Sequence, residues 1–135
     1  MTDRVIACRL KDLFAHVPDY RMEDLLLLKN GRHFRLSPVL KLILGRNKEE
    51  NEMIQVLARS EMELFWPDGF RGPTATLCGQ VIPPDDQMIG EIMARYSQEE
   101  RESYLICKRT LGKDPSSFAV LKKFPAKRLE GLRIG

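Results

Sequence analysis

The sequence predicts an α+β fold: a mainly antiparallel sheet of about six strands, with two main helices and a short N-terminal helix. Apolar runs of strand length, separated by turn residues, indicate the sheet, and two of them alternate at the two-residue period of a half-buried strand. Two longer segments repeat at helical spacing instead. Because the 135 residues contain no repeat, low-complexity tract or linker, we expect a single domain with its own core.

The N-terminal part predicts a short amphipathic helix over residues 6–16, which Pro18 ends. We expect Phe14 to anchor this helix in the core. Residues 24–29 form an apolar run of strand length, followed by an Asn-Gly step at 30–31. Asn-Gly is a hairpin-turn signal because both positions tolerate a positive φ. Residues 24–29 are therefore interpreted as a strand that pairs with the next one.

Two more strands are predicted over residues 33–36 and 39–44, joined by a turn at Ser-Pro 37–38. Side chains alternate between the faces of a strand. In the second strand, one face should carry Leu40, Leu42 and Leu44 and the other Lys41 and Ile43. With residues 24–29, these strands would form an antiparallel meander.

Two Gly-Arg steps, at 31–32 and 45–46, stand at the edges of these apolar runs. After the second step, Asn47 is placed as a helix N-cap, with Glu50 three residues later as in a capping box. Arg46 would then lie beside a helix N-terminus, where free backbone amides and the positive end of the dipole favour an anion such as phosphate. Pure capping is the favoured role for Glu50.

The rest of the chain continues the same pattern. A helix is predicted over residues 48–60, with an apolar stripe of Met53, Ile54, Val56 and Leu57, and further strands over 62–66, 74–79, 104–112 and 118–124. Pro83-Pro84 breaks the chain before a helix over 85–97, in which Gly90 would allow close packing on the sheet. The basic tail is expected to dock through Leu129, Leu132 and Ile134.

Composition and charge are those of a soluble globular protein, with 43% hydrophobic and 30% charged residues. No apolar run approaches a membrane span and the N-terminus lacks a signal-peptide core, so a cytoplasmic location is expected. The net charge of +3 hides an asymmetry, because residues 101–135 hold nine Lys or Arg and three Asp or Glu. A basic C-terminal third indicates a polyanionic partner.

The sequence lacks the signatures of an enzyme, a metal site or a cofactor site. The three cysteines (Cys8, Cys78 and Cys107) form no metal-type pair and are expected to be buried, reduced thiols. The only histidines are His16 and His33, so acid–base options are few. His33 lies between two arginines, which favours loss of its proton. We therefore expect an isolated chain without catalytic activity, cofactor or metal.

Cationic side chains on strand edges and corners favour nucleic-acid binding. Arg32, Arg35, Lys41 and Arg46 can neutralise phosphates, and arginine can also stack on bases. Arg71 lies between Phe70 and Gly72 in a Gly/Pro loop that also follows Trp66. An exposed aromatic ring there could stack an unpaired base. For Trp66, packing at a strand end is the favoured alternative.

The motifs GRHFRL and LGRNKEEN resemble the NFACT-type RNA-binding domain, in the variety found at the C-terminus of proteins similar to tRNA 2-thiouridylases. The resemblance runs from about Leu10 to the Gly72-Pro73 step, and more loosely to Tyr96. The family pattern of a Gly-Arg-Asn corner, a second Asn and a helix is met by Gly45-Arg46-Asn47 and Asn51. The chain departs from the broader pattern in the segment LFWPDGFRGPTA, which lacks two histidines.

The resemblance implies one RNA-binding domain over residues 1–135, a C-terminal part of a longer protein. Its ligand would be RNA, with tRNA expected, and it would serve a separate ATP-dependent thiolation domain in the same polypeptide. The alternative is a protein-interaction or dimerisation domain that positions the catalytic domain. The candidate RNA-contacting residues are Arg32, His33, Arg35, Lys41, Arg46, Asn47, Asn51 and Arg71.

Overall fold

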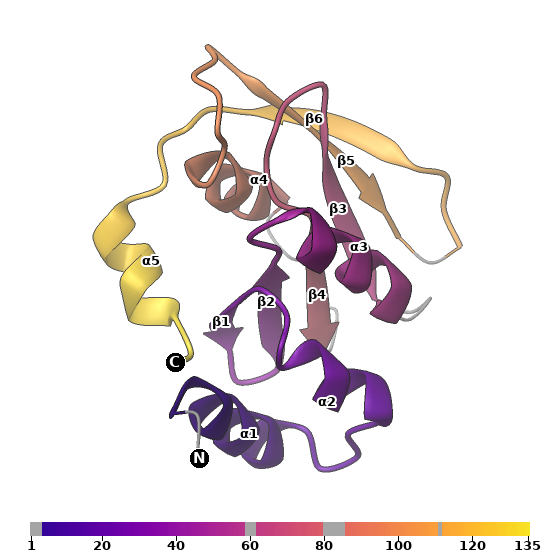
Figure 1. Ribbon diagram of the computed structural model, residues 1–135. Coiled ribbons are helices and arrows are strands. Elements are labelled where there is room, and N and C mark those ends of the chain that lie inside the picture. The colour runs from indigo at the N-terminus through magenta and orange to yellow at the C-terminus, as the bar shows by residue number, and fades with distance from the viewer. Residues whose placement is uncertain (1–3, 59–61, 80–85, 111) are drawn as a thin grey trace.

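The computed structural model describes residues 4–58, 62–79, 86–110 and 112–135 (Figure 1). In chain order its elements are α1 (Arg4–His16), α2 (Met22–Leu27), β1 (Arg32–Ser37), β2 (Leu40–Leu44), α3 (Lys48–Leu57), β3 (Glu63–Asp68), β4 (Ala75–Gly79), α4 (Asp86–Arg95), β5 (Tyr104–Arg109), β6 (Ser116–Val120) and α5 (Ala126–Leu132). The predicted helix end at 59–60, the Pro83-Pro84 break and Asp85 lie outside the described residues. Among the helices within the described ranges, none has the length and apolar character needed to cross a membrane.

The six strands form one sheet in the order β1-β2-β4-β3-β5-β6, and each neighbouring pair is antiparallel. Helices cover both faces, and α5 lies beside the β1 edge (Figure 1). The C-terminus reaches α1 there, because Gly135 lies against Val5. The predicted α+β class and mainly antiparallel sheet are confirmed.

The alternation predicted for β2 separates the two halves of the core. Leu42 and Leu44 are fully buried in a cluster with residues of α4 and α5. Ile43, also fully buried, points to the opposite face and packs with Leu27 of α2 and Ile54 of α3. The sheet is therefore the middle layer between α4 and α5 on one side and α2 and α3 on the other.

Residues 24–29 are not a strand: most of this segment is the helix α2. Asp24 accepts a hydrogen bond from the Arg21 amide (2.8 Å) at the start of the helix, a local stabilisation of the first turn. Leu27 and Leu28 are buried, whereas Leu26 is 46% exposed, as one helix face requires. A run of four leucines cannot distinguish a short helix from a strand by periodicity. The Asn-Gly turn consequently joins a helix to β1 rather than two strands.

Helix α1 buries a different face from the one expected. Phe14 is 54% exposed, so it does not anchor the core, and Leu13 is buried instead. Arg9 lies one turn before Leu13 and is also buried. Its guanidinium donates to the carbonyl oxygens of Leu28 (2.6 Å) and Gly31 (2.8 Å). A buried arginine thus fixes α1 to the turn that precedes β1.

The apolar stripe of α3 is narrower than predicted. Ile54 is fully buried, but Met53 is 43% exposed and Val56 is 77% exposed. Leu57 packs at the edge of the same cluster as Ile54. Consecutive apolar residues on a helix point in directions about 100° apart, so a short helix on a flat sheet buries only some of them.

The C-terminal segment contains a helix, α5, that was not predicted from the sequence. Its docking was predicted, and Leu129 and Ile134 are indeed buried. The Ile134 amide donates to the His33 carbonyl (2.9 Å), and Phe34 pairs with Arg133 as an isolated bridge beside β1. The end of the chain therefore lies along β1, the edge strand that follows the first Gly-Arg step.

The cysteines are less buried than expected. Cys8 is exposed on α1, and Cys78 and Cys107 are half-buried. Burial is thus wrong for Cys8, because it lies on a helix of which only one side faces the body.

Gly90 brings α4 close to the sheet, as predicted. A Cβ atom at this position would lie 2.7 Å from Cγ1 of Val120 and 2.8 Å from Cε2 of Phe118. Both distances are shorter than a van der Waals contact, so only glycine allows this approach of the helix to β6.

We expect Gly90→Ala to lower the free energy of unfolding by about 1–2 kcal/mol, because overpacking outweighs the gain in helix propensity. The matched control is Gly131→Ala in α5, where a new Cβ would meet nothing within 4 Å. That substitution should raise stability by about 0.5–1 kcal/mol. Urea denaturation of both variants measures the difference, and a stabilising Gly90→Ala would contradict close packing.

Candidate functional site

A groove of about 740 Å³ opens between the start of β1, the β2–α3 corner, the β3–β4 loop and the segment after α4. The structure brings five of the eight candidate residues together in its lining. These are Arg32, Arg46, Asn47, Asn51 and Arg71, beside the rings of Trp66, Phe70 and Tyr96. Segments from four separate parts of the chain meet at this site.

The corner before α3 has the predicted N-cap. The Asn47 side chain accepts a hydrogen bond from the Glu50 amide (2.9 Å). The Glu50 side chain, however, does not return to the cap residue as in a standard capping box. It accepts from the amide of Arg46 (3.0 Å), one residue earlier. This shift by one residue connects α3 directly to the Gly45-Arg46 step.

The Glu50 carboxylate joins the two Gly-Arg steps of the sequence. It accepts from Nε (2.9 Å) and Nη2 (2.8 Å) of Arg46, and it is also hydrogen-bonded by the backbone of Gly31. The Arg46 guanidinium first, and then the backbone amides, lower the pKa of Glu50 to about 2. Glu50 thus has a larger role than the capping predicted for it.

Arg46 keeps capacity for a ligand despite this ion pair. Its side chain is 45% exposed, whereas that of Glu50 is 11% exposed. A guanidinium has five N–H donors, of which Glu50 occupies two. The hydrogen bond with Glu50 also raises the pKa of Arg46. The carboxylate therefore orients the Arg46 guanidinium and leaves three of its N–H donors for a ligand.

Asn51, one of the candidate RNA-contacting residues, holds the corner to β4. Its side-chain oxygen accepts from the Thr74 amide (3.0 Å), and the Gly45 amide donates to the Thr74 carbonyl (2.9 Å). A Cβ atom at Gly45 would overlap the Asn51 amide group. Gly45 is consequently needed for close approach, and Asn51 both shapes the groove and lines it.

Arg32 is held by the ring of Tyr96, a residue within the helix predicted over 85–97 and not among the candidate site residues. Its guanidinium carbon lies 4.3 Å from the centroid of the Tyr96 ring, a cation–π contact. Burial lowers the pKa of Arg32, although not enough to discharge an arginine. In the sequence, Tyr96 stands directly before a polar segment, and this position was the one sign that its ring has a role outside the core.

The β3–β4 loop is fastened to the segment after α4. The Arg71 carbonyl accepts from the Gln98 amide (3.0 Å) and the Ser97 hydroxyl (3.2 Å). Phe70 packs edge-on against Tyr104, with ring centroids 5.1 Å apart. The Arg71 side chain itself stays exposed. This loop therefore presents a cation on a fixed backbone.

Trp66 packs at a strand end, as the favoured alternative predicted, and its role in stacking a base stays a prediction. It is half-buried and packs against the cluster that contains Ile54. It also lines the groove.

His33 cannot contact a ligand, because its side chain is fully buried. Its Nε2 atom lies 3.1 Å from the Leu27 carbonyl and 3.0 Å from the Asn30 carbonyl, as a donor to the turn before β1. Desolvation first, and then the charges of Lys41 and Arg9, hold the pKa of His33 well below 6.5. Loss of the proton was expected, but its main cause is burial rather than the neighbouring arginines.

Arg35 and Lys41 lie away from the groove, in a pocket of about 440 Å³ under α1. Arg35 is paired with Asp12 of α1 and is mostly buried. Lys41 is 4% exposed, and burial lowers its pKa. Both side chains leave the strands on the face opposite to that of Phe34 and Leu42. The alternation predicted from the sequence separates the two faces, but it does not say which face meets a ligand.

The groove is predominantly cationic. Besides the three arginines its lining includes Lys48, which was not among the candidates, and the acidic Glu52. Within the described residues, no group of three or more His, Cys, Asp and Glu side chains could hold a metal ion. Cations, backbone amides and aromatic rings make this a place to bind anions and flat rings.

We expect Glu50→Gln to lower the free energy of unfolding by about 2–3 kcal/mol at pH 7, because the folded state holds the Glu50 pKa at about 2, below the ordinary 4.5. This stabilisation is present above pH 4.5 and is lost as the pH falls toward 2. The variant and the natural chain should therefore converge in acid. The control is Glu49→Gln, an exposed neighbour. Denaturation at several pH values tests this, and a gap that persists at low pH would contradict it.

Comparison with known proteins agrees with this geometry. A model of the family described as the NFACT protein RNA binding domain matches residues 31–131. A similar solved structure is the C-terminal part of the fibronectin/fibrinogen-binding protein from Streptococcus suis, with a TM-score of 0.60 and 9% identity over 96% of this chain and 68% of that chain. At this identity the likeness concerns the fold alone. The curated proteins include no match. Because the family model covers most of the chain, including every residue that lines the groove, the chain belongs to the NFACT protein RNA binding domain family.

Proposed function

We propose that the groove binds an unpaired segment of tRNA for an ATP-dependent thiolation domain in the same polypeptide. The observation that carries this proposal is the convergence of Arg32, Arg46 and Arg71 with Trp66 and Phe70 in one groove of an RNA-binding domain. Cations neutralise the backbone of RNA, and aromatic rings stack its unpaired bases. Bases in a helix are already stacked, so this combination favours a loop or an end.

The β2–α3 corner would supply the phosphate contacts of this proposal. The amides of Lys48 and Glu49 precede the first intrahelical hydrogen bond, which runs from Asn51 to Asn47. They can meet a phosphate oxygen at the positive end of α3, with Arg46 beside them. The outer face of the Arg32 guanidinium, whose inner face covers Tyr96, can stack a base.

The motifs GRHFRL and LGRNKEEN support the narrower part of the proposal, namely tRNA and a thiolation partner, because they resemble the branch fused to tRNA 2-thiouridylase-like proteins. Their residues supply Arg32, Arg46, Asn47 and Asn51 to the groove. A cytoplasmic location would accompany this role. The domain contributes RNA binding, and the transfer chemistry belongs to the partner domain.

A second function, docking of a partner protein, has its own observation. Phe14 (54% exposed) and Tyr20 (42%) form a tilted ring pair with centroids 5.2 Å apart, and α2 exposes Met22 (65%) and Leu26 (46%). None of these residues lines the groove. An exposed apolar surface of this kind suits a catalytic domain positioned by α1 and α2.

We expect Arg71→Ala to weaken binding of tRNA by roughly fivefold to tenfold and to reduce the slope of log affinity against log salt by about 0.7. The reason is the loss of one phosphate contact, with little effect on folding because the side chain is exposed. The control is Lys113→Ala, an equal change of charge at an exposed turn outside the groove. Fluorescence anisotropy over a salt series measures both effects.

Binding that is independent of salt, or equal losses in the Arg71 and Lys113 variants, would contradict the groove as the RNA site. The docking function predicts instead that the natural chain still binds a catalytic domain after nuclease treatment. The Arg71→Ala variant should bind that domain equally well, whereas Phe14→Ser should abolish binding.

A further inference from the structure

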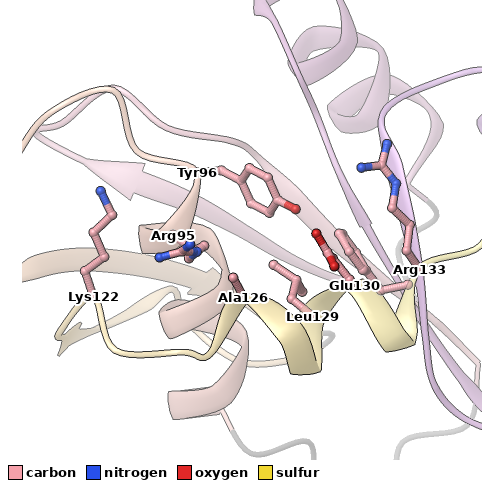
Figure 2. A pocket seen from close by; sticks show the side chains of 8 residues that line it. Arg95, Tyr96, Lys122, Ala126, Leu129, Glu130 and Arg133 are labelled. Atoms are coloured by element: carbon pink, nitrogen blue, oxygen red, sulfur yellow. The ribbon is translucent and has the colours of Figure 1, made fainter.

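A second pocket, of about 430 Å³, lies next to the groove between the end of α4, α5 and β1 (Figure 2). It is lined by Phe34, Arg95, Tyr96, Lys122, Ala126, Leu129, Glu130 and Arg133. Tyr96 also lines the groove, so one aromatic ring stands between the two sites. A strand of RNA that crosses Tyr96 would pass from one site to the other.

The pocket has an apolar floor with cations on two sides. Phe34 and Leu129 are buried beneath it, and the Tyr96 ring lies 6.3 Å from that of Phe34. Figure 2 shows Arg95 and Lys122 on one side of the Leu129 side chain and Arg133 on the other. A flat base over an apolar floor, with backbone phosphates on either side, matches this distribution of charge.

Lys122 already forms an ion pair with Glu100 (2.8 Å), but Glu100 is 86% exposed, so the pair is weak and easily exchanged for a phosphate. The side chains of Arg95 and Arg133 make no ion pair within the part of the chain that the structure describes. These two guanidinium groups can therefore meet phosphates without breaking a contact in the fold.

Glu130 is the unexpected group in this pocket. Its carboxylate points toward the Tyr96 hydroxyl in Figure 2. It forms no ion pair with any residue that the structure describes, although Arg133 lies three positions later. A carboxylate repels phosphate, so a pocket built for phosphate alone would exclude it. Two adjacent acceptor oxygens instead match a base edge that offers two adjacent donors.

We propose that this pocket selects an unpaired guanine, next to the nucleotide held in the groove, with Glu130 as the residue that determines the base. Guanine offers its N1–H and its exocyclic amino group side by side, and a carboxylate can accept both. Uracil would instead face Glu130 with at least one carbonyl oxygen, and two acceptors cannot pair. The inference rests on the proposed function, because it requires RNA in the groove.

The test uses the full chain and short oligouridylates with guanosine, inosine or uridine at one central position, with affinity measured by fluorescence anisotropy. We expect guanosine to bind roughly tenfold more tightly than uridine, as for a two-hydrogen-bond base contact. Inosine, which lacks the amino group, should fall between them.

Glu130→Gln separates base selection from simple electrostatics. Loss of a negative charge should by itself strengthen binding of all three oligomers alike. Glutamine has only one acceptor oxygen, so the selection predicts that the ratio of guanosine to uridine affinities falls toward one. Glu102→Gln, an exposed acid outside the pocket, removes the same charge and should leave the ratio unchanged.

Equal affinities for guanosine and uridine, or an unchanged ratio in the Glu130 variant, would overturn guanine selection. If the oligomers then still bind with a salt slope that depends on Arg71, the groove stands and only this inference fails. If no oligomer and no tRNA binds, both fail together.

Discussion

The Glu50 carboxylate is the contact on which the site depends. It meets the Gly31 backbone, the Arg46 amide and the Arg46 guanidinium. The first strand of the sheet and the first turn of α3 therefore share one buried acceptor. Arg32 directly follows Gly31, and Arg46 directly follows Gly45. Glu50 therefore sets the distance between the two candidate ligand cations. Its low pKa shows how strongly the folded state prefers the charged form.

The two faces of the sheet have different roles. On the face of α2 and α3, buried polar groups such as Arg9 and His33 fasten the turn before β1 through backbone carbonyls. On the face of α4 and α5, the close approach at Gly90 and the docking of Leu129 close the larger part of the core. The groove lies where the ends of β1 and β3 meet the β2–α3 corner and the β3–β4 loop. Binding residues on turns held by a rigid sheet are a common arrangement.

Tyr96 connects the groove to the pocket under α5. One face of its ring carries Arg32, and its centroid lies 6.3 Å from that of the Phe34 ring in the core. The ring is thus fixed from two sides while it still lines both sites. The family match spans residues 31–131 and ends within α5, so it contains every residue that lines the groove, whereas α1 and α2 lie entirely before it. The apolar surface of α1 is therefore a feature apart from the RNA-binding part of the chain.

The sequence by itself predicted the six strands of the sheet, the alternation of β2, the Asn47 cap and the Gly-Arg-Asn corner, because these depend on period-two patterns and on local turn chemistry. It also singled out, as candidates, the groove-lining residues Arg32, Arg46, Asn47, Asn51 and Arg71, which stand at glycine turns or a helix start. Tertiary structure decided the rest. Whether the leucine run before Asn30 forms a helix, whether Phe14 or Leu13 is buried, and whether His33 and Lys41 face a ligand depend on which elements pack above them. Those contacts join residues far apart in the chain, and so no local pattern records them.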